Sequence, residues 1–317
     1  MSVYLGVDVG GTNVKWALLE RRAHEWALGE IGSAATHAGE GPEAVVERVG
    51  AIAARAIASV GGVESVGVGV PGVFDKDRGI ALLLPNLPGD WNGVALRQPI
   101  EAASGTHVAL VNDARAFALA ELALGAGRGS ETAVFVTLGT GVGGGVAVGG
   151  RLHLGREGRA GEVGHVTVDT GADAPQCGCG NRGCAEAFTT AQAIASSAER
   201  ATVKEVVEAA RAGDGRARRA LDRAGFYIGV ALANAVVLLA PERIVVGGGV
   251  VGAGDLLLDP LRRELTRRVH VSSPVAVVAA ELGVHAGAVG AAAWAATATE
   301  PVPTPALAWP GERPSEP

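Results

Sequence analysis

Apolar and polar positions along the first 124 residues predict short strands interrupted by helices. Three apolar segments of strand length open the chain at 3–9, 14–19 and 25–31, with turn-length gaps between them. This spacing predicts an antiparallel meander. Apolar residues at helical intervals predict a helix at 42–60. The elements predicted after it are a strand at 66–70, a loop-like stretch at 73–93, a helix at 94–103, a strand at 108–111 and a helix from 113 to 124.

The same pattern restarts after residue 131. Apolar segments at 132–138 and 142–148 flank a Gly-Thr-Gly turn, which again predicts two strands joined by a turn. A Gly-rich, irregular stretch follows at 150–187. The elements predicted beyond it are helices at 190–212 and 217–240, a strand at 244–246, a helix at 256–269, a strand at 275–278 and a helix at 286–296. Two halves with the same order of elements predict a duplicated α/β fold.

Length and composition indicate two domains. The chain has 317 residues, of which 48% are hydrophobic, enough for two domains with buried cores. We predict a smaller N-terminal α/β domain at 1–111, which the helix at 286–296 completes, and a larger α/β domain at 112–285. The Pro-rich residues 299–317 predict a disordered tail.

Charge and hydropathy argue against two classes of partner. The chain has 27 basic and 33 acidic residues, a net charge of −6, so it lacks the broad basic surface that nucleic acids require. Its most apolar helical stretch, 228–240, is shorter than the ~20 residues that cross a bilayer. No basic segment precedes the first strand, and the few cysteines do not form a secreted disulfide framework. We therefore predict a cytoplasmic protein without nucleic-acid or membrane partners.

Two glycine turns are the first candidates for a functional site. The segment 139–144 matches the dinucleotide pattern G-x-G-x-x-G, but that motif requires a helix, and a strand is predicted to follow. Backbone N–H groups of a glycine turn can instead surround a phosphate, with a threonine hydroxyl as a further donor. Either turn alone is also explained as an ordinary hairpin. One such turn in each half, at 10–12 and 139–141, predicts that the pair binds nucleotide phosphates between the domains, with Asp8 orienting Mg²⁺.

Five motifs, in the same order, resemble the ROK family over residues 3–295. They are Asp8-Xaa-Gly-Gly-Thr, Asn112-Asp113, Leu138-Gly-Thr-Gly-Xaa-Gly-Gly-Gly, Glu162-Xaa-Gly-His165 and Cys177-Xaa-Cys-Gly-Xaa-Xaa-Gly-Cys184-Xaa-Glu186. That family comprises bacterial sugar kinases and related repressors with the actin/hexokinase/ribonuclease H-like fold. The resemblance therefore implies two domains with mixed sheets and a cleft between them. The loop at 85–91 departs from the family pattern by one additional residue, which leaves its sugar contacts open.

Three cysteines and a histidine have the composition of a structural zinc site. Cys177, Cys179 and Cys184 lie within eight residues and follow His165, and three thiolates with one imidazole make a closed tetrahedral ligand set. The alternative, buried cysteines that act as small apolar residues, fits the surrounding glycines and polar residues poorly. In the family that the chain resembles, these ligands bind zinc. We predict a structural Zn²⁺ that braces the loop and takes no part in the chemistry.

Asp113 is the predicted catalytic residue. It follows a strand and begins a helix, where an aspartate is commonly an N-cap. Its neighbour Asn112 and the family resemblance assign it instead as the general base, which accepts the proton of a sugar 6-hydroxyl as that oxygen attacks the γ-phosphate. The resemblance and the surrounding sequence assign the sugar contacts to Gly72, Asn86, Asn112, Asp113, Glu162, His165 and Glu186.

The nucleotide contacts are expected at the two turns and at a third glycine cluster. The residues predicted to bind the phosphates and Mg²⁺ are Asp8, Gly10, Gly11, Thr12, Asn13, Lys15, Gly139, Thr140 and Gly141. The resemblance assigns the adenosine to Gly247, Gly248 and Gly249, which a plain strand-to-helix turn explains nearly as well.

Together these features predict an ATP-dependent hexose kinase of carbohydrate metabolism, with glucokinase as the first hypothesis. An N-acetylmannosamine or N-acetylglucosamine kinase is the alternative, because such kinases share the zinc and Glu-Xaa-Gly-His motifs. A sugar-responsive repressor is a distant alternative, because the first strand at residue 3 leaves no room for a helix-turn-helix. The family resemblance implies a homodimer or homotetramer.

Overall fold

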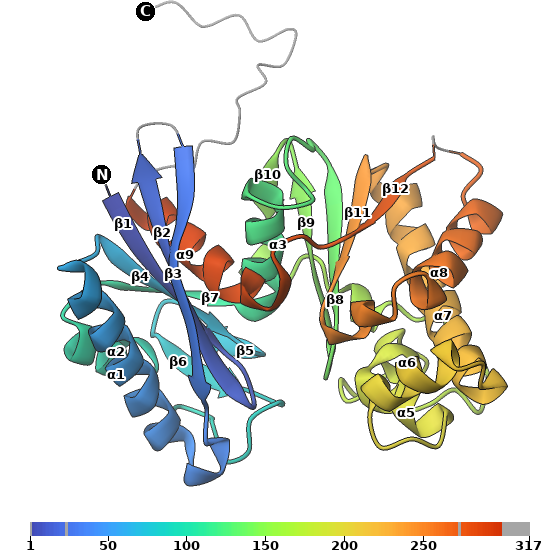
Figure 1. Ribbon diagram of the computed structural model, residues 1–317, viewed down its shortest axis with the longest axis horizontal. Helices are drawn as coiled ribbons and strands as arrows, with labels where there is room; N and C mark the ends of the chain where they lie inside the picture. The colour runs from blue at the N-terminus through green and yellow to red at the C-terminus, as the bar shows by residue number, and fades with distance from the viewer. Residues whose placement is uncertain (1, 23–24, 272–273, 300–317) are drawn as a thin grey trace, which may run out of the picture.

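Two five-stranded sheets form the centres of two lobes in a computed structural model, which describes residues 2–22, 25–271 and 274–299. Figure 1 shows the N-terminal lobe, largely blue, beside the C-terminal lobe, green to orange. Two helices, α3 (Asp113–Ala123) and α9 (Ala286–Thr299), lie between the lobes. The predicted α/β fold with mixed sheets is confirmed.

The N-terminal lobe, called the small lobe below, contains the first sheet and a separate short hairpin. Its elements are β1 (Ser2–Val9), β2 (Asn13–Arg22), β3 (Glu25–Ala35), η1 (Ala38–Glu40), α1 (Pro42–Val60), β4 (Ser65–Val70), β5 (Val73–Asp75), β6 (Ile80–Leu83), α2 (Arg97–Ser104) and β7 (Val108–Asn112). The sheet has the order β3-β2-β1-β4-β7. Strands β1, β2 and β3 form the predicted antiparallel meander, and β4 and β7 run parallel to β1.

The C-terminal lobe, called the large lobe below, repeats this connectivity. Its elements are β8 (Ala133–Leu138), β9 (Val142–Val148), β10 (Arg151–His153), η2 (Arg156–Gly158), η3 (Val163–His165), α4 (Glu186–Thr189), α5 (Ala191–Ser197), α6 (Val203–Arg211), α7 (Gly215–Leu239), β11 (Arg243–Gly247), η4 (Gly249–Ala253), α8 (Asp255–Arg268), β12 (Ala276–Ala279) and η5 (Gly283–His285). The sheet order β10-β9-β8-β11-β12 is again an antiparallel meander continued by two parallel strands. The predicted duplication is therefore confirmed.

Helix α9 crosses the first sheet at a separation that only glycine permits. A Cβ atom at Gly6 of β1 would overlap Ala288 O, and one at Gly67 of β4 would overlap Ala291 O. On its other side α9 packs against α3, which in turn packs on β9 of the large lobe. The final helix thus lies on the sheet of the small lobe, although it follows the large lobe in sequence. The domain boundary at 111 and 112 stays a prediction; in the structure it coincides with the end of β7.

The stretch at 73–93, expected as a loop, contains the antiparallel hairpin of β5 and β6. Asp75 turns the chain there, because its Oδ1 atom accepts backbone N–H bonds from Asp77 at 3.0 Å and Arg78 at 2.9 Å. Boundaries also differ, because β3 continues to Ala35 and α2 begins only at Arg97, and the Gly-rich stretch contains the short strand β10. Strands this short carry too few alternations to be recognised in sequence.

The helix expected at 190–212 is two helices, α5 and α6. Glu199, between them, has a left-handed φ of 53°, and Thr202 caps α6 by accepting a hydrogen bond from the backbone N of Glu205 at 3.3 Å. The apolar spacing continues across the break, because both helices bury a face in the same core. The N-cap residue Thr202 is therefore the sequence signal for a new helix that was missed.

Among the described residues, α7 is the one helix long and apolar enough to cross a membrane. The prediction that the apolar stretch at 228–240 falls short of such a length is wrong, because the helix continues from Gly215 to Leu239. Half of its membrane-length window is buried inside the large lobe, and α7 packs along α8. We therefore interpret α7 as a core helix. The predicted tail at 299–317 lies outside the described residues, apart from Thr299, where α9 ends.

Candidate active site

The turn between β1 and β2, residues 10–12, is the first tip. Gly10 N donates to Asn13 O at 3.0 Å. Thr36, a buried residue directly after β3, donates its hydroxyl to Gly10 O at 2.6 Å and its backbone N–H to Thr12 O at 2.8 Å. Thr36, which the sequence reasoning missed, holds the tip in shape, and Thr12 at the tip is exposed.

Two further predicted residues reach the site from loops of the small lobe. A Cβ atom at Gly11 would lie 2.9 Å from Asn86 O, so the loop that carries Asn86 packs directly on the first tip. Gly72 has a φ of 99°, and its carbonyl accepts a hydrogen bond from Asn112 Nδ2 at 3.2 Å. The structure therefore brings both loops to the end of the sheet where β1, β4 and β7 finish.

Asp8 stands at the end of β1, enclosed by its neighbours. Lys15 lies directly opposite on β2, and a Cβ atom at Gly287 in the first turn of α9 would lie 2.6 Å from Asp8 Oδ2. Burial raises the pKa of Asp8, and the charge of Lys15 acts in the opposite direction. The first turn of a helix favours a carboxylate, so the start of α9 also stabilises the ionised form.

Asp113 begins α3, and the residue before it is the N-cap. Asn112 Oδ1 accepts hydrogen bonds from the backbone N atoms of Ala114 at 3.1 Å and Arg115 at 3.3 Å. Burial raises the pKa of Asp113 to about 7, and the charges of Asp8 and Glu162 act in the same direction. This influence of Asp8 means that Asp113 lies near the end of β1, where the first tip begins.

Arg115 is a residue of the site that the sequence reasoning missed. It lies in the first turn of α3 with a side chain only 3% exposed. Its Nη1 atom donates to Asn112 Oδ1 at 3.2 Å, and its Nη2 atom donates to Glu162 Oε1 at 2.6 Å. A charged residue among the apolar residues that follow Asp113 in this helix was the available signal. Glu162 directly precedes η3, which contains His165.

The turn at 139–141 between β8 and β9 is the second tip. Gly139 N donates to Gly141 O at 3.0 Å, and Thr140 is exposed. Glu186 Oε2 accepts a hydrogen bond from Val142 N at 2.9 Å, directly after the tip. Glu186 therefore ties the second tip to the start of α4, and a sugar ligand at Glu186 would lie next to this tip.

The glycine cluster at 247–249 packs against the end of β8. Gly248 has a φ of 88°, and a Cβ atom there would overlap Leu138 O. A Cβ at Gly247 would overlap the Phe117 ring of α3, whereas at Gly249 it would meet no atom within 4 Å. Two of the three glycines are thus explained by packing alone, and the cluster lies beside the second tip.

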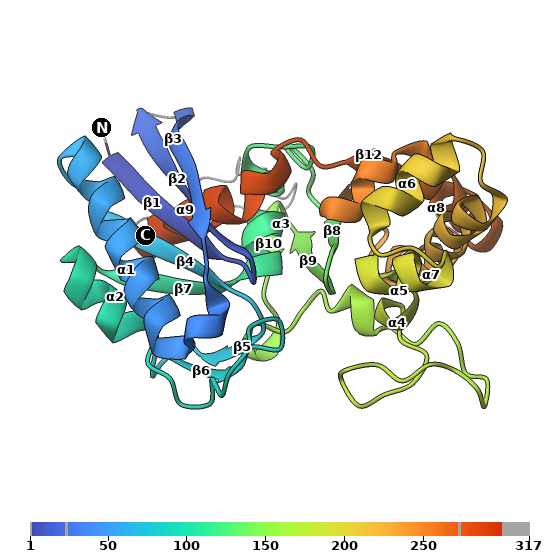
Figure 2. The same cartoon turned by 60° about the horizontal axis from the view of Figure 1, so that its bottom comes forward.

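The loop between η3 and α4 brings the predicted zinc ligands together. Figure 2 shows this loop extending from the large lobe beyond α4. The potential ligand atoms of His165, Cys177, Cys179 and Cys184 all lie within 4.8 Å of one another. Cys177 Sγ is 3.7 Å from His165 Nδ1, and Cys179 Sγ is 3.7 Å from Cys184 Sγ.

These separations fit a tetrahedral metal. Ligands about 2.3 Å from a central ion lie about 3.7 Å apart. Burial raises the pKa of the Cys177 thiol to about 12, so a bare cluster disfavours the thiolate that a cation would stabilise. Cys177 Sγ also lies 3.5 Å from Glu186 Oε1, which connects the cluster to the second tip. The residues therefore fit a structural Zn²⁺.

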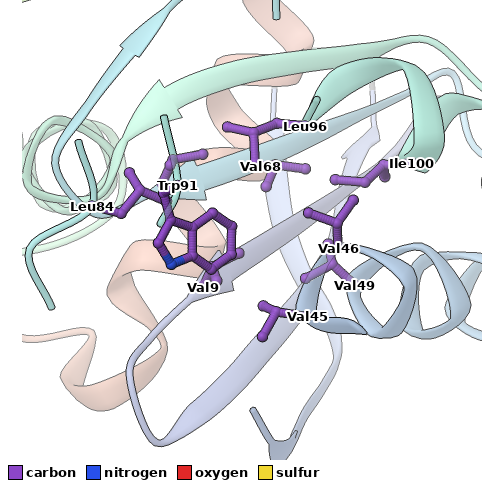
Figure 3. Close-up of a pocket in the computed structure, with 10 residues that line it drawn as sticks. Val9, Val45, Val46, Val49, Val68, Leu84, Trp91, Leu96 and Ile100 are labelled. Carbon is purple, nitrogen blue, oxygen red and sulfur yellow. The ribbon is translucent and has the colours of Figure 1, made fainter. Parts of the chain in front are cut away.

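A small cavity in the small lobe is separate from these groups. It has a volume of about 20 Å³, and Figure 3 shows its apolar lining. Trp91, Leu84 and Ile100 line it together with valines of β1, α1 and β4. A hexose does not fit in this volume, and no charged side chain lines it. The cavity is a packing defect of the core.

Comparisons with known proteins give a consistent result over nearly the whole chain. The family model described as ROK family matches residues 4–298. The glucokinase of Thermotoga maritima is 36% identical over 312 residues, which cover 91% of this chain and 95% of that protein.

Solved structures give the same answer. The ROK hexokinase from Thermus thermophilus is 36% identical with a TM-score of 0.79, and the match covers 94% of this chain and 99% of that one. A ROK family glucokinase from Streptomyces griseus, solved in complex with glucose and AMPPNP, is 34% identical with a TM-score of 0.80. That match covers 93% of this chain and 100% of the other.

Proposed function

The chain belongs to the ROK family, and from this premise we propose that it is an ATP-dependent glucokinase, which converts glucose and ATP to glucose 6-phosphate and ADP. The relative solved with glucose and AMPPNP shares its fold over 93% of this chain. The observation that carries the proposal in this structure is the position of Asp113, a half-buried carboxyl at the start of α3 that the charge of Asp8, at the end of β1, reaches.

Asp113 is the general base of the proposed reaction. It accepts the proton of the glucose 6-hydroxyl as that oxygen attacks the γ-phosphate of ATP. A base is most effective when its pKa lies near the working pH, and burial raises the pKa of Asp113 to about 7. Phosphoryl transfer requires mainly positioning and charge neutralisation, so one carboxylate in this place is sufficient.

The two tips bind the phosphates of ATP through backbone N–H groups and through the exposed hydroxyls of Thr12 and Thr140. Lys15 adds a positive charge, and Asp8 orients the magnesium ion. Mg²⁺, when bound with ATP, supplies charge neutralisation between the phosphate oxygens. The remaining residues that we assign to the nucleotide are Gly10, Gly11, Asn13, Gly139, Gly141, Gly247, Gly248 and Gly249.

Glucose is bound by groups from both lobes. Asn112 and the Gly72 and Asn86 loops come from the small lobe, and Glu162, His165 and Glu186 come from the large lobe. A carboxylate accepts hydrogen bonds from hydroxyls in fixed directions, so a sugar that lacks one of them leaves a charged group unpaired. Zn²⁺ bound by His165 and the three cysteines holds the loop that joins η3 to α4, next to Glu162 and Glu186. The ion takes no part in the chemistry.

The test is a coupled kinase assay of the purified full chain with a panel of acceptors and donors. We expect the highest kcat/KM with glucose and ATP and a requirement for Mg²⁺. Preference for N-acetylmannosamine or N-acetylglucosamine would replace glucose as the substrate, and absence of any hexose phosphorylation would reject the kinase. We place the enzyme in the cytoplasm as a homodimer or homotetramer, and light scattering measures the oligomeric state. We expect no nucleic-acid partner, which a gel-shift assay checks.

A further inference from the structure

The Arg115 guanidinium is a buried charge that links three groups of the site. It donates to Asn112 Oδ1 at 3.2 Å and to Glu162 Oε1 at 2.6 Å. Its Nε atom is buried without a hydrogen-bond partner in the described part of the chain. The side chain is 3% exposed, whereas that of Glu162 is 44% exposed. Arg115 is therefore held by the protein on the side of Glu162 that faces away from solvent.

Such an arrangement is a poor device for stability. Burial of a guanidinium carries a desolvation penalty, and an ion pair repays it only when the remaining donors are also satisfied. The Nε atom of Arg115 is not satisfied among the described residues. A well-packed apolar side chain at this place would stabilise the start of α3 as well. The charge and the forked geometry of Arg115 thus point to the site.

The contacts of Arg115 connect the two lobes. Asn112, which accepts from Arg115, donates through Nδ2 to Gly72 O of the small lobe at 3.2 Å. Glu162 belongs to the large lobe and directly precedes η3. One guanidinium therefore fixes the amide of Asn112 and the carboxylate of Glu162 relative to each other, and Asp113 lies between Asn112 and Arg115 in the chain.

We propose that Arg115 is a positioning residue that fixes the side chains of Asn112 and Glu162 relative to Asp113. The sugar hydroxyls that these side chains bind are then held at the correct position for the base, Asp113. The proposal rests on the proposed function. Arg115 occupies Oε1 of Glu162 and leaves Oε2 for a hydroxyl. It is not a catalytic residue, because its contacts are with the protein groups that bind the sugar.

A second consequence concerns the charge at Asp113. The charged groups that act on this carboxyl are Asp8 on β1, Glu162 before η3 and Arg115 on α3. The two carboxylates raise the pKa of Asp113, and Arg115 lowers it. Removal of the guanidinium therefore raises this pKa further, and the acid limb of the pH profile of kcat/KM moves to higher pH.

The test compares Arg115→Met and Arg115→Lys with the wild-type enzyme and with Arg268→Met. Arg268 pairs with Glu264 on α8, far along the chain from the site groups. For Arg115→Met we expect the KM for glucose to rise by roughly 10- to 100-fold, an unchanged KM for ATP, and the alkaline shift of the acid limb. Arg115→Lys keeps the charge but not the fork, so the KM rises without the shift. Arg268→Met changes neither.

Coupling to Glu162 distinguishes positioning from general damage. If Arg115 acts through Glu162, Glu162→Gln raises the glucose KM, and the double variant Arg115→Met with Glu162→Gln is less impaired than the product of the two single effects. Thermal unfolding by circular dichroism checks folding, and Arg115→Lys replaces Arg115→Met if the latter is unfolded.

The outcomes separate the two proposals. A wild-type chain that phosphorylates no hexose overturns the proposed function and with it the role of Arg115. An active wild type with equal changes in the KM values for ATP and glucose, or with an unchanged glucose KM and pH profile in the Arg115 variants, overturns the positioning role alone.

Discussion

At the scale of single residues, Asn112 and Asp113 divide the start of α3 between them. An aspartate at the start of a helix usually serves as the cap. Here Asn112 Oδ1 accepts hydrogen bonds from the backbone N atoms of Ala114 and Arg115, and Asp113 Oδ1 accepts a further one from Ala114 N at 2.8 Å. Asp113 is held at its backbone by α3, and its carboxyl lies among charged groups. Asn112 therefore takes the N-cap position, and Asp113 shares the N–H donor of Ala114 with it.

The pKa of Asp113 gives a direct prediction for pH dependence. Burial raises this pKa to about 7, and only the deprotonated carboxylate can accept a proton. We therefore expect kcat/KM to fall about tenfold for each pH unit below 7, as the carboxyl becomes protonated. Asp113→Asn, which cannot accept the proton, lowers kcat by ~10²–10⁴-fold at neutral pH. Initial rates between pH 5 and 9 measure both effects.

Asp77→Asn is the matched control, because Asp77 is 80% exposed in the turn after β5. It keeps wild-type rates and the same acid limb. Near-normal turnover of Asp113→Asn would remove Asp113 from the chemistry, and an acid limb well below pH 6 would contradict the pKa.

Sequence reasoning at this scale found residues that stand in motifs and missed those that support them. Asp8, Asp113 and the cysteines were recognised because short spacing in sequence defines each motif. Arg115 and Thr36 were missed because their partners lie 47 and 26 residues away in the chain. Such contacts depend on how strands and helices meet in space. A charged residue among apolar ones marks Arg115 in the sequence, but it does not reveal the contact with Glu162.

At the scale of elements, the loop from η3 to α4 contains no long helix or strand, and its regular pairing consists of two isolated β-bridges, Thr167 with Cys184 and Gln176 with Arg182. Its ordered contacts include a hydrogen bond from Asn181 Nδ2 to Thr167 Oγ1 at 3.0 Å and the cluster of His165 and three cysteines. Such short-range pairing fixes a loop of this length only weakly, so an ion bound by the cluster would supply much of its folding energy.

We predict about one Zn²⁺ per chain in protein purified without chelator. Removal of the ion loosens the loop, which raises the KM for glucose and exposes the loop to protease, and re-addition of Zn²⁺ reverses both. Elemental analysis and limited proteolysis before and after chelation measure the effect. A folded chain with full activity and far less than stoichiometric metal would disprove the structural role. Ser196→Ala on α5, outside the cluster, retains the metal and serves as the control.

Element prediction succeeded where a segment is long and periodic or continuously apolar. Helix α1 was predicted because it buries one face with a regular spacing, and parallel strands such as β4 were predicted because they are short, continuously apolar runs buried on both faces. The hairpin of β5 and β6 was missed because three and four residues give no period. Helices α5 and α6 were merged because apolar residues on both sides of the break bury a face in the same core.

At the scale of the whole molecule, the two lobes are connected by the packing of α3 on α9. Glu121, fully buried near the end of α3, accepts backbone N–H bonds from Glu281 at 3.1 Å and Leu282 at 2.9 Å. It thereby fixes the segment that leads from β12 into α9. The duplication could be predicted from sequence because each half repeats locally, whereas the position of α9 between the lobes depends on contacts more than 150 residues apart.

Gly290 is the point at which this arrangement can be tested. In the interior of a helix alanine is more stable than glycine by about 1 kcal/mol, so Gly290→Ala in an isolated helix would stabilise it. Here a Cβ atom would overlap Ala116 O of α3, and relief requires that the two helices move apart. We therefore expect the variant to lower the free energy of unfolding by roughly 1–3 kcal/mol.

The same displacement has a kinetic signature. The first turn of α9 lies against Asp8, and α3 begins with Asp113, so separation of the helices shifts the phosphate side of the site relative to the base. We expect Gly290→Ala to raise the KM for both ATP and glucose, unlike the Arg115 variants, which affect glucose alone. Gly39→Ala, where an added Cβ meets no atom within 4 Å, is the control and leaves stability and kinetics unchanged. Urea unfolding and initial rates distinguish these cases. A Gly290→Ala protein that is more stable than the wild type would show that α9 and α3 do not pack closely at Gly290, and this would contradict the role of that contact in joining the lobes.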